Sequence, residues 1–460
     1  MKRVCMLLLC LTLCLGSVQS LGQGTDAGYL QDYLTDLSQG ENLDTLYACL
    51  DTTMQAALSR EDFASLWGQL AAISGEFLGF DGDTESTAMG EYLVLTQRLD
   101  MSGMDMSGMD LMCTMSLDAS GKVAGLQFTP APATADETAP SAGVTEEAIQ
   151  VGEAPWELPG LLTLPENAQG PLPAVVLVQG SGPSDRNESV GAVKPFYDLA
   201  QALAAQGIAV VRYDKRTYVY GEEIASSASY SSFTVEEETI QDAIAAGELL
   251  AGDPRIDPDR IYLLGHSLGA MLGPRIVQES GELFAGMILA CGSNDSLMDI
   301  MIRQNQDVID ALADEETRAA AQAQLDAECA KAEGLAALST EEAQQSTLFG
   351  QPAYYFWEMA QHPTPAELLQ KLEKPVLLIN GDRDFQVTVA EGRESWEEAL
   401  DLSAPWVSHL WADVNHLLMR PEAPEEVKGT SAEYMIPCAV DAEVTDAIGA
   451  FIHAEKEKNP

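Results

Sequence analysis

The segment that decides the fold reads Ile261-Tyr262-Leu263-Leu264-Gly265-His266-Ser267-Leu268-Gly269-Ala270. Its first four residues form an apolar run typical of a buried strand, and the small residues after the serine favour the start of a helix. In a tight turn between the two, Gly265 and Gly269 remove side chains that would collide as the chain reverses. We therefore predict that Ser267 stands exposed at the end of the strand. The N–H groups of the following helix can stabilise a negative charge there.

A serine hydroxyl is a weak nucleophile and needs a base, which in turn needs a carboxylate to orient it. The sequence has five histidines. His416 follows the apolar run 408–411, in a loop at the carboxyl end of the last expected strand. This topology places it over the serine, so we predict that His416 is the base. The others fall in the turn, in an inserted cap, on the last strand and in the terminal helix: His266, His362, His409 and His453.

Two aspartates compete for the role of the orienting acid. The apolar run 376–379 leads into Asn380-Gly381-Asp382-Arg383-Asp384. We favour Asp384, because the loop there curls back toward the histidine. Asp382 is expected to cap the turn or to pair with Arg383 on the surface. The chain order Ser267, Asp384, His416 separates this arrangement from the other Ser/His/Asp folds.

A second glycine-rich loop follows an earlier apolar run, in Val176-Leu177-Val178-Gln179-Gly180-Ser181-Gly182-Pro183. Its glycines allow the backbone N–H of Ser181 to approach a substrate oxygen, with the N–H of Leu268 on the other side. We predict an oxyanion hole from these two groups; the alternative is an ordinary glycine-rich turn. The loop lacks the third glycine and the acidic residue of a dinucleotide site, so no such cofactor is expected.

Apolar runs alternate with helical segments from residue 154 onward. This pattern predicts a mostly parallel sheet flanked by helices over residues 153–460. One interval of about 75 residues, 294–372, reads as helical throughout and is expected to form a cap over the carboxyl ends of the strands. The expected strands cover residues 158–164, 174–178, 208–213, 261–264, 286–290, 376–379 and 408–411.

Several separated motifs carry a family resemblance. They are Gln179-Gly180-Ser181-Gly182-Pro183-Ser184-Asp185-Arg186-Asn187-Glu188, Lys194-Pro195-Phe196, Arg212-Tyr213-Asp214-Lys215-Arg216 and residues 265–270, 380–387 and 415–417. Over about residues 154–455 the chain resembles the bacterial α/β-hydrolase group of serine aminopeptidase-like and esterase-like proteins. The resemblance implies an α/β-hydrolase fold, a Ser/Asp/His hydrolase with no metal or organic cofactor, and carboxylesterase activity. It departs at Gln179, where most members have His in a position that shapes the loop but donates no essential proton.

The residues before the hydrolase segment divide into three parts. Lys2 and Arg3 precede a short apolar run and small residues, which indicates a signal peptide over residues 1–20 with cleavage after Ser20. Helical patterns and then alternating strands predict a small α+β domain over residues 21–130. Its last hairpin, ending in Gly125-Leu126-Gln127-Phe128-Thr129-Pro130, resembles cone-shaped ketosteroid-isomerase-like domains. Residues 131–152, rich in Pro, Ala and Thr, are expected to be a linker.

Composition limits the partners. The chain has 24 basic and 72 acidic residues, a net charge of −48. Such a surface repels nucleic acid and anionic membranes. Five cysteines remain after the signal peptide, without metal-site spacing, and are expected to be mostly buried thiols. A repeat, Met101-Ser102-Gly103-Met104-Asp105 followed by Met106-Ser107-Gly108-Met109-Asp110, is interpreted as a hairpin tip and not as a Cu(I) site.

The leading hypothesis is a secreted or extracytoplasmic carboxylesterase that acts on a small ester or acyl substrate. No membrane span is expected to persist after signal cleavage. The same triad serves amide cleavage and thioester acyl transfer, which are the alternatives. A non-catalytic ligand-binding protein on a hydrolase scaffold is a further alternative. The charged segment 212–216 is expected to form a structural ion pair with Asp185 or Glu188 and, alternatively, to bind a substrate carboxylate.

Overall fold

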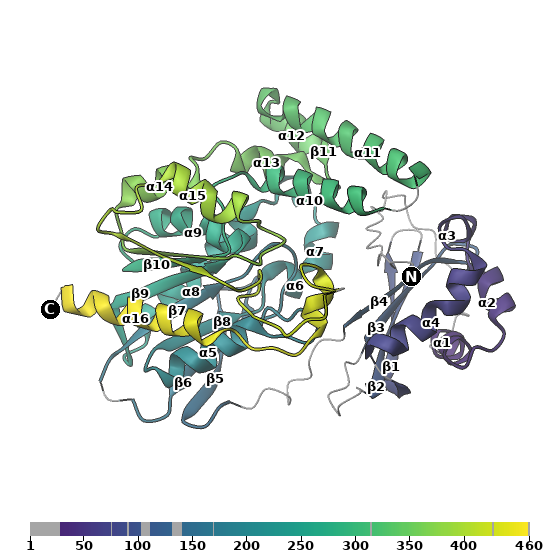
Figure 1. The fold of residues 1–460 in the computed structure, drawn as a ribbon, viewed down its shortest axis with the longest axis horizontal. Helices are drawn as coiled ribbons and strands as arrows, with labels where there is room; N and C mark the ends of the chain where they lie inside the picture. Colours follow the sequence, from purple (N-terminus) through teal and green to yellow (C-terminus); the bar gives the residue numbers. More distant parts are fainter. Residues whose placement is uncertain are drawn as a thin grey trace. The chain divides into compact units, whose positions relative to one another are not determined.

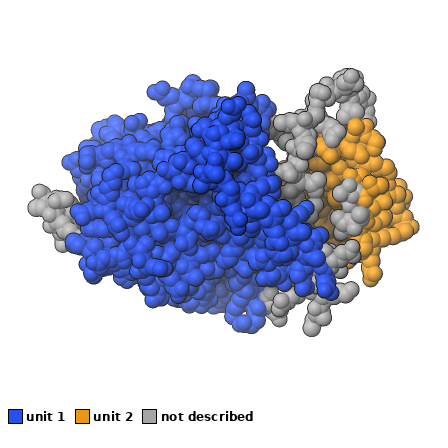
Figure 2. All heavy atoms as spheres, turned by 90° about the horizontal axis from the view of Figure 1, so that it is seen from above, with its two compact units in different colours: residues 1–5, 138–189, 193–460 blue, residues 6–137, 190–192 orange. Residues whose placement is uncertain are grey.

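The computed structural model describes residues 28–74, 76–89, 92–102, 111–130, 140–168, 170–312, 315–425 and 427–458. Within them the chain divides into two compact units, which Figure 2 shows in different colours. The larger unit holds residues 140–189 and 193–458, and the smaller holds residues 28–130 and 190–192. The predicted signal peptide, the second copy of the methionine repeat and the first part of the predicted linker lie outside the described residues.

An eight-stranded mixed sheet forms the centre of the larger unit (Figure 1). Its order is β14-β13-β10-β9-β7-β8-β6-β5, and the first six of these strands are parallel. Strands β6 and β5 are antiparallel to their neighbours and complete one edge. The bounds are β5 (Val144–Val151), β6 (Leu158–Pro165), β7 (Leu172–Val178), β8 (Ala209–Tyr213), β9 (Ile256–His266), β10 (Gly286–Ala290), β13 (Val376–Gly381) and β14 (Val407–Ala412).

Helices cover both faces of this sheet, because its central strands are apolar on both sides. Alternate side chains of a strand point to opposite faces. Thus Leu263 packs in the core cluster that includes residues of α8 and α9, whereas the ring of Tyr262 lies 6.1 Å from that of Phe451 in α16. The flanking helices are α5 (Pro195–Ala205), α8 (Gln241–Gly252), α9 (Leu268–Glu279), α14 (Pro365–Leu372), α15 (Ser395–Ala399) and α16 (Ala442–Lys458).

Shorter helical segments connect these elements. Between β8 and α8 lie α6 (Arg216–Val219), α7 (Gly221–Ser226), η1 (Tyr230–Ser232) and the π-helical turn η2 (Glu236–Ile240). Near the carboxyl end of the chain lie the π-helical turn η4 (Ala390–Glu394) and the 3₁₀ turn η5 (Ser431–Met435).

The segment between β10 and α14 forms a cap, and Figure 1 shows its helices gathered at one side of the larger unit. A small core of its own includes Leu335, Leu348 and Phe356. The predicted cap, 294–372, extends too far, because Ala366 and Leu369 of α14 pack in the main core. It is also not helical throughout, since a two-stranded hairpin interrupts it. Its elements are α10 (Leu297–Ala311), α11 (Glu315–Gly334), η3 (Leu335–Ala337), α12 (Thr340–Gln345), β11 (Thr347–Leu348), β12 (Gln351–Pro352) and α13 (Ala353–Met359).

Four helices followed by a four-stranded antiparallel sheet form the smaller unit. Its core includes Leu34 of α1, Phe63 of α4 and Met115 of β3. The helical part of this unit ends with α4 at Ser74, and β1 then begins at Glu76, with register shifts beside Gly79 and before Glu85. The elements are α1 (Gly28–Gln39), α2 (Leu43–Cys49), α3 (Thr52–Ala57), α4 (Arg60–Ser74), β1 (Glu76–Met89), β2 (Tyr92–Ser102), β3 (Leu111–Leu117) and β4 (Val123–Pro130).

The end predicted for the linker, residue 152, is also wrong. Residues 144–151 form β5 at the edge of the large sheet, and they pair with β6 along their whole length. Only Val144 and Val151 of this strand are buried, so its sequence lacks the apolar run that marks the inner strands. All five cysteines in the described residues are free thiols. No described helix combines the length and the hydropathy that a membrane crossing requires.

Candidate active site

Ser267 lies in the turn between β9 and α9 with φ 53° and ψ −117°. This left-handed conformation is rare for a residue with a side chain and is found where a turn aims a side chain for function. The two glycines make the turn possible. A Cβ on Gly265 would lie 2.1 Å from the carbonyl oxygen of Gly269, and a Cβ on Gly269 would lie 2.3 Å from that of Val178. Neither contact is tolerable, so both positions require glycine.

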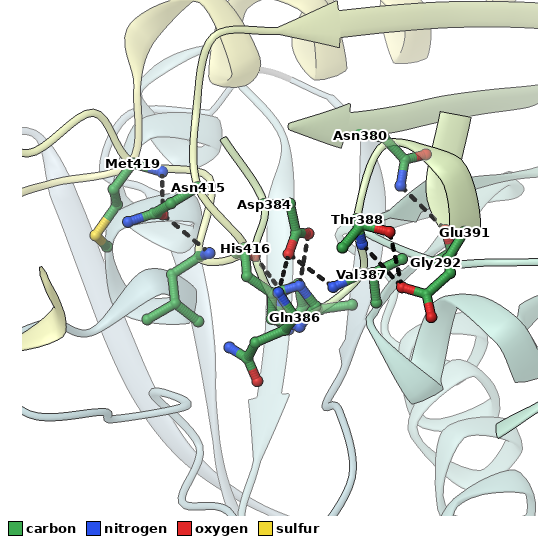
Figure 3. Close-up of polar contacts among 12 residues, drawn as sticks. Gly292, Asn380, Asp384, Gln386, Val387, Thr388, Glu391, Asn415, His416 and Met419 are labelled. Carbon is green, nitrogen blue, oxygen red and sulfur yellow. Dashed lines mark hydrogen bonds and ion pairs between the residues drawn. The ribbon is translucent and has the colours of Figure 1, made fainter. Parts of the chain in front are cut away.

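Asp384 and His416 come from the loops after the adjacent strands β13 and β14, and they meet. Nδ1 of His416 lies 2.7 Å from Oδ2 of Asp384, and both side chains are buried (Figure 3). The other carboxylate oxygen accepts the backbone N–H groups of Gln386 and Val387, each at 2.8 Å. Both oxygens of this carboxylate therefore have partners. Asp382, the competing candidate, is exposed on the surface.

A tight turn positions His416. Oδ1 of Asn415 accepts the backbone N–H groups of Leu417 and Met419, at 3.1 and 3.2 Å, and Leu418 adopts a positive φ of 61°. These contacts, which Figure 3 includes, fix the loop that carries the imidazole. Three other histidines lie elsewhere and are exposed: His362 in the cap, His409 on β14 and His453 on α16.

The fifth histidine, His266, is buried directly before Ser267. Its Nδ1 lies 3.0 Å from Oε1 of Glu188, its Nε2 lies 2.8 Å from the carbonyl oxygen of His416, and the two imidazole rings are 4.8 Å apart. Burial lowers the pKa of His266, but the charge and hydrogen bond of Glu188 outweigh this, and the net direction is upward from 6.5. His266 thus joins the loop of His416 to the strand that ends in Ser267.

No hydrogen bond joins the Ser267 hydroxyl to His416 within the described residues. Such contacts are often long before substrate binds and shorten in the reacting complex. The imidazole is oriented as a general base requires. Its Nδ1 faces the carboxylate of Asp384, and its Nε2 remains available to exchange a proton. The structure therefore brings Asp384 and His416 into contact and ties His416 to the residue before Ser267.

The predicted oxyanion loop lies against the serine. A Cβ on Gly180 would lie 3.1 Å from Cβ of Ser267, which places this backbone directly beside the hydroxyl-bearing side chain. Neither the N–H of Ser181 nor that of Leu268 donates to an acceptor in the described part of the chain. Leu268 is the first residue of α9, where such N–H groups have no partner within the helix. Both predicted donors are thus free of an acceptor in the described residues, one in the loop beside Ser267 and one directly after it in the chain.

The charged segment 212–216, which begins in β8, forms ion pairs, but not with the predicted partners. Arg212 pairs with Glu146, Lys215 with Glu238, and Arg216 with Asp242. Asp214 pairs with Arg186 at 2.6 Å. The prediction of Asp185 or Glu188 as the partner is wrong, because Glu188 turns inward to His266 and Asp185 accepts N–H and O–H groups of its own loop. Arg383, expected to pair with Asp382, pairs instead with Asp413 at 2.5 Å.

A thiol and two imidazoles lie close enough to each other to invite comparison with a metal site. His266, Cys291 and His416 each place one possible ligand atom within 4.8 Å of the others, and all three residues are buried. However, both nitrogens of His266 already contact protein atoms, and Nδ1 of His416 contacts Asp384. An ion would have to displace these hydrogen bonds. We therefore assign the cluster to the hydrogen-bond network around Asp384 and His416.

Sequence reasoning missed Glu188, Lys215 and Cys291 as neighbours of the site. Glu188 and Lys215 are charged residues in segments that carry the family resemblance, yet only 5% and 1% of their surfaces are exposed. A charged residue in a loop is normally solvated, so burial was not predictable from residue type. A signal was available in the density of charges over residues 185–188 and 212–216, which exceeds what a surface turn needs.

Comparisons with known proteins agree with this architecture. Residues 175–429 match the alpha/beta hydrolase family. Esterase EstD of Thermotoga maritima is 32% identical over 419 residues, which cover 90% of this chain and 92% of that protein. Its likeness therefore extends over the smaller unit as well as the larger one.

Solved structures resemble about two thirds of the chain at low identity. An esterase of Pyrococcus furiosus is 16% identical with a TM-score of 0.40, covering 67% of this chain and 91% of its own. Est1E from Butyrivibrio proteoclasticus is 13% identical with a TM-score of 0.41, covering 67% and 99%. Proline iminopeptidase of Mycobacterium smegmatis is 18% identical with a TM-score of 0.42, covering 68% and 100%.

Proposed function

The chain belongs to the alpha/beta hydrolase family, and from this premise we propose that it is an exported serine esterase with the triad Ser267, His416 and Asp384. One observation carries the proposal. The 2.7 Å contact between Asp384 and His416 forms where two adjacent strands end, beside a serine held at positive φ. The 32% identity to a protein named as an esterase favours esters over other acyl compounds.

The geometry supports a two-step reaction through an acyl-enzyme. The oxygen of Ser267 attacks the ester carbonyl carbon while His416 takes the proton of the Ser267 hydroxyl. The electrons of the carbonyl double bond move onto the carbonyl oxygen. The N–H groups of Ser181 and Leu268 stabilise that oxyanion. When the electrons return, the bond to the alcohol breaks and His416 protonates the leaving alkoxide. Water then repeats the sequence, releasing the acid and restoring the serine.

Asp384 acts on the histidine and not on the substrate. Its hydrogen bond to Nδ1 leaves Nε2 unprotonated and turned to the reaction, and its charge stabilises the imidazolium that forms in each step. Two backbone N–H groups on its other oxygen keep the carboxylate in place.

The decisive experiment uses a fluorophosphonate probe, which labels activated serines. We expect labelling of the wild type and none of Ser267→Ala, while Ser280→Ala at the far end of α9 serves as the matched control. Labelling that persists in Ser267→Ala would refute the assignment of the nucleophile. Absence of labelling in the wild type, with normal folding by circular dichroism, would support the non-catalytic alternative.

A substrate panel separates the ester hypothesis from its alternatives. We expect p-nitrophenyl esters to turn over faster than aminoacyl anilides and thioesters. Faster anilide cleavage would identify an amide hydrolase, and transfer of the acyl group to an added amine or alcohol in preference to water would identify an acyltransferase.

The proposal of export rests on the sequence of residues 1–20. Expression of the full chain should release a mature protein whose first residue is Leu21, which N-terminal sequencing would detect. Retention of Met1 in a cell-associated protein would contradict it.

For the smaller unit, four helices on an antiparallel sheet support the proposed likeness to ketosteroid-isomerase-like domains.

A further inference from the structure

The backbone of Gly180 is held on both sides by buried charged residues. Its N–H donates to Oε1 of Glu188 at 2.8 Å, and its carbonyl oxygen accepts from Nζ of Lys215 at 2.7 Å. Glycine leaves the backbone more freedom than any other residue, so a loop of this composition does not fix its own peptide planes. External contacts must do so, and here they come from a carboxylate and an ammonium group.

The contact with Lys215 determines where the next N–H points. In a trans peptide the C=O of one residue and the N–H of the next point in opposite directions. Because Lys215 holds the carbonyl of Gly180, the N–H of Ser181 must point away from Lys215. Gly180 itself lies against Ser267, so the peptide that carries this N–H is next to the serine. A cation on the carbonyl also polarises the peptide and strengthens its N–H as a donor.

Stability alone does not explain a lysine at this position. Its ammonium group is buried and pairs with the carboxylate of Glu238 at 2.7 Å. Removing two charges from water costs free energy that their attraction often fails to recover, and apolar residues of similar volume are commonly as stable or more so. The second contact, with the carbonyl of Gly180, is the one that connects this pair to the reaction.

The same carboxylate reaches the cap. The other oxygen of Glu238, in η2, accepts the hydroxyl of Tyr355 at 2.6 Å, and Tyr355 belongs to cap helix α13. Burial, and then the charge of Glu238, raise the pKa of Tyr355, so it stays protonated and donates. A continuous chain of contacts therefore runs from α13 through Glu238 and Lys215 to the loop beside Ser267.

We propose that Lys215 is a positioning residue that aims the N–H of Ser181 at the oxyanion, and that Glu238 and Tyr355 make this aim depend on the seating of the cap. The inference rests on the proposed function. It assigns a task to the cap beyond enclosing substrate: a displaced α13 releases Glu238, Lys215 loses its fixed position, and the oxyanion donor loses its direction.

The test compares neighbouring cations and neighbouring tyrosines in the full-length protein. Lys215→Met removes the ammonium group but keeps the stem, and Arg216→Met removes the adjacent cation, which pairs with Asp242 and does not touch the loop. Tyr355→Phe removes the hydroxyl from Glu238, and Tyr354→Phe is its control, since Tyr354 stacks on Trp357. The readouts are kcat, KM, melting temperature and the carbonyl stretching frequency of the acyl-enzyme, measured by isotope-edited infrared difference spectroscopy.

We expect Lys215→Met to lower kcat by about 10²-fold, as loss of one oxyanion donor does, with KM nearly unchanged. Its acyl carbonyl should absorb at higher frequency, because a weaker oxyanion hole polarises the carbonyl less. Tyr355→Phe should shift both quantities in the same direction by a smaller amount, and the double variant should be no worse than Lys215→Met. Lys215→Arg, which keeps a cation, should recover part of kcat.

Equal kcat and equal carbonyl frequency in folded Lys215→Met and Arg216→Met would overturn the inference. If Lys215→Met does not fold, Lys215→Arg and Tyr355→Phe decide: a carbonyl frequency identical to wild type in both would overturn it equally. Loss of labelling in Ser267→Ala together with unchanged spectra in the lysine variants would reject this inference alone. Persistent labelling in Ser267→Ala would reject the proposed function itself.

Discussion

Two buried pairs of an imidazole and a carboxylate lie side by side in the larger unit. In one, Nδ1 of His416 contacts Asp384 at 2.7 Å; in the other, Nδ1 of His266 contacts Glu188 at 3.0 Å. They differ at the second ring nitrogen. Nε2 of His266 is hydrogen-bonded to a backbone carbonyl oxygen at 2.8 Å, whereas Nε2 of His416 has no hydrogen-bond partner within the described residues.

This difference teaches that a carboxylate-bound histidine is not by itself a catalytic one. A base must exchange a proton in each half-reaction, so one nitrogen has to be available to the substrate. His266 offers neither nitrogen and instead joins two loops. If the proposed function holds, the two pairs are the same chemical unit, used once for reaction and once for architecture, and substitutions can separate the two uses.

The largest difference in activity between the two pairs is expected when their histidines are replaced. His416→Ala should lower kcat by about 10⁴- to 10⁶-fold, as loss of a triad member does, with a near-normal melting temperature. His266→Ala should leave far more activity and cost stability, because it removes two buried hydrogen bonds. Hydrolysis of p-nitrophenyl esters and thermal melting measure both effects. Full activity in His416→Ala, with loss in His409→Ala, would show that the base is His409.

The carboxylates should separate in the same way. Asp384→Asn should lower kcat by about 10⁴-fold at neutral pH, because an amide in that position favours the wrong tautomer of the histidine. In contrast, Asp382→Asn, on the same loop but exposed, should leave kcat unchanged and is the matched control. The comparison would fail if the two variants lost activity equally.

Glu188→Gln should act mainly on folding. It replaces a charge that accepts from both Gly180 and His266 by a neutral amide, and about 1–3 kcal/mol of unfolding free energy is expected to be lost. Urea unfolding followed by tryptophan fluorescence measures this. An unchanged midpoint would show that the second pair contributes nothing to the architecture assigned to it.

A smaller effect is expected with pH. Because the pKa of His266 in the folded protein lies above its ordinary value of 6.5, its pairing contributes fully below about pH 6.5. That contribution is lost as the pH rises through the folded value. The stability difference between wild type and Glu188→Gln should therefore shrink from pH 6 to pH 9 at constant ionic strength. A difference that stays constant from pH 6 to pH 9 would mean that His266 is neutral in the folded state.

The sequence predicted the fold of the larger unit well because its features are local. The turn 265–269 needs glycine at two positions, and the inner strands are apolar on both faces. The edge strand β5 carries no such signal, because its sequence is polar and largely exposed, and it therefore falls within the predicted linker. Helix α14 has the same amphipathic pattern as a cap helix, and only tertiary packing tells the two apart.

At the site, the proposed triad residues could be selected by chain order and by their place after strands. Their supporting groups could not. Glu188 and Lys215 become buried because the chain folds back around Gly180 from both segments, and nothing in residue type predicts such a pairing. The partners predicted for segment 212–216 are wrong because tertiary packing, and not residue type, brings Glu238 and Asp242 of the following helical stretch to Lys215 and Arg216.

The path of the cap has a consequence for how such proteins diversify. The chain leaves the sheet after β10 and returns before β13, and the two ends meet, since Oδ1 of Asn294 accepts the N–H of Ala366 at 2.9 Å. A segment whose ends coincide can be exchanged as a cassette without altering the route of its host, as domain insertions are. Descendants of one ancestor can thus acquire new pockets while inheriting the reaction unchanged. On the inference drawn above, a transplanted cap must, however, bring its own counterpart of Tyr355, whose hydroxyl donates a hydrogen bond to Glu238.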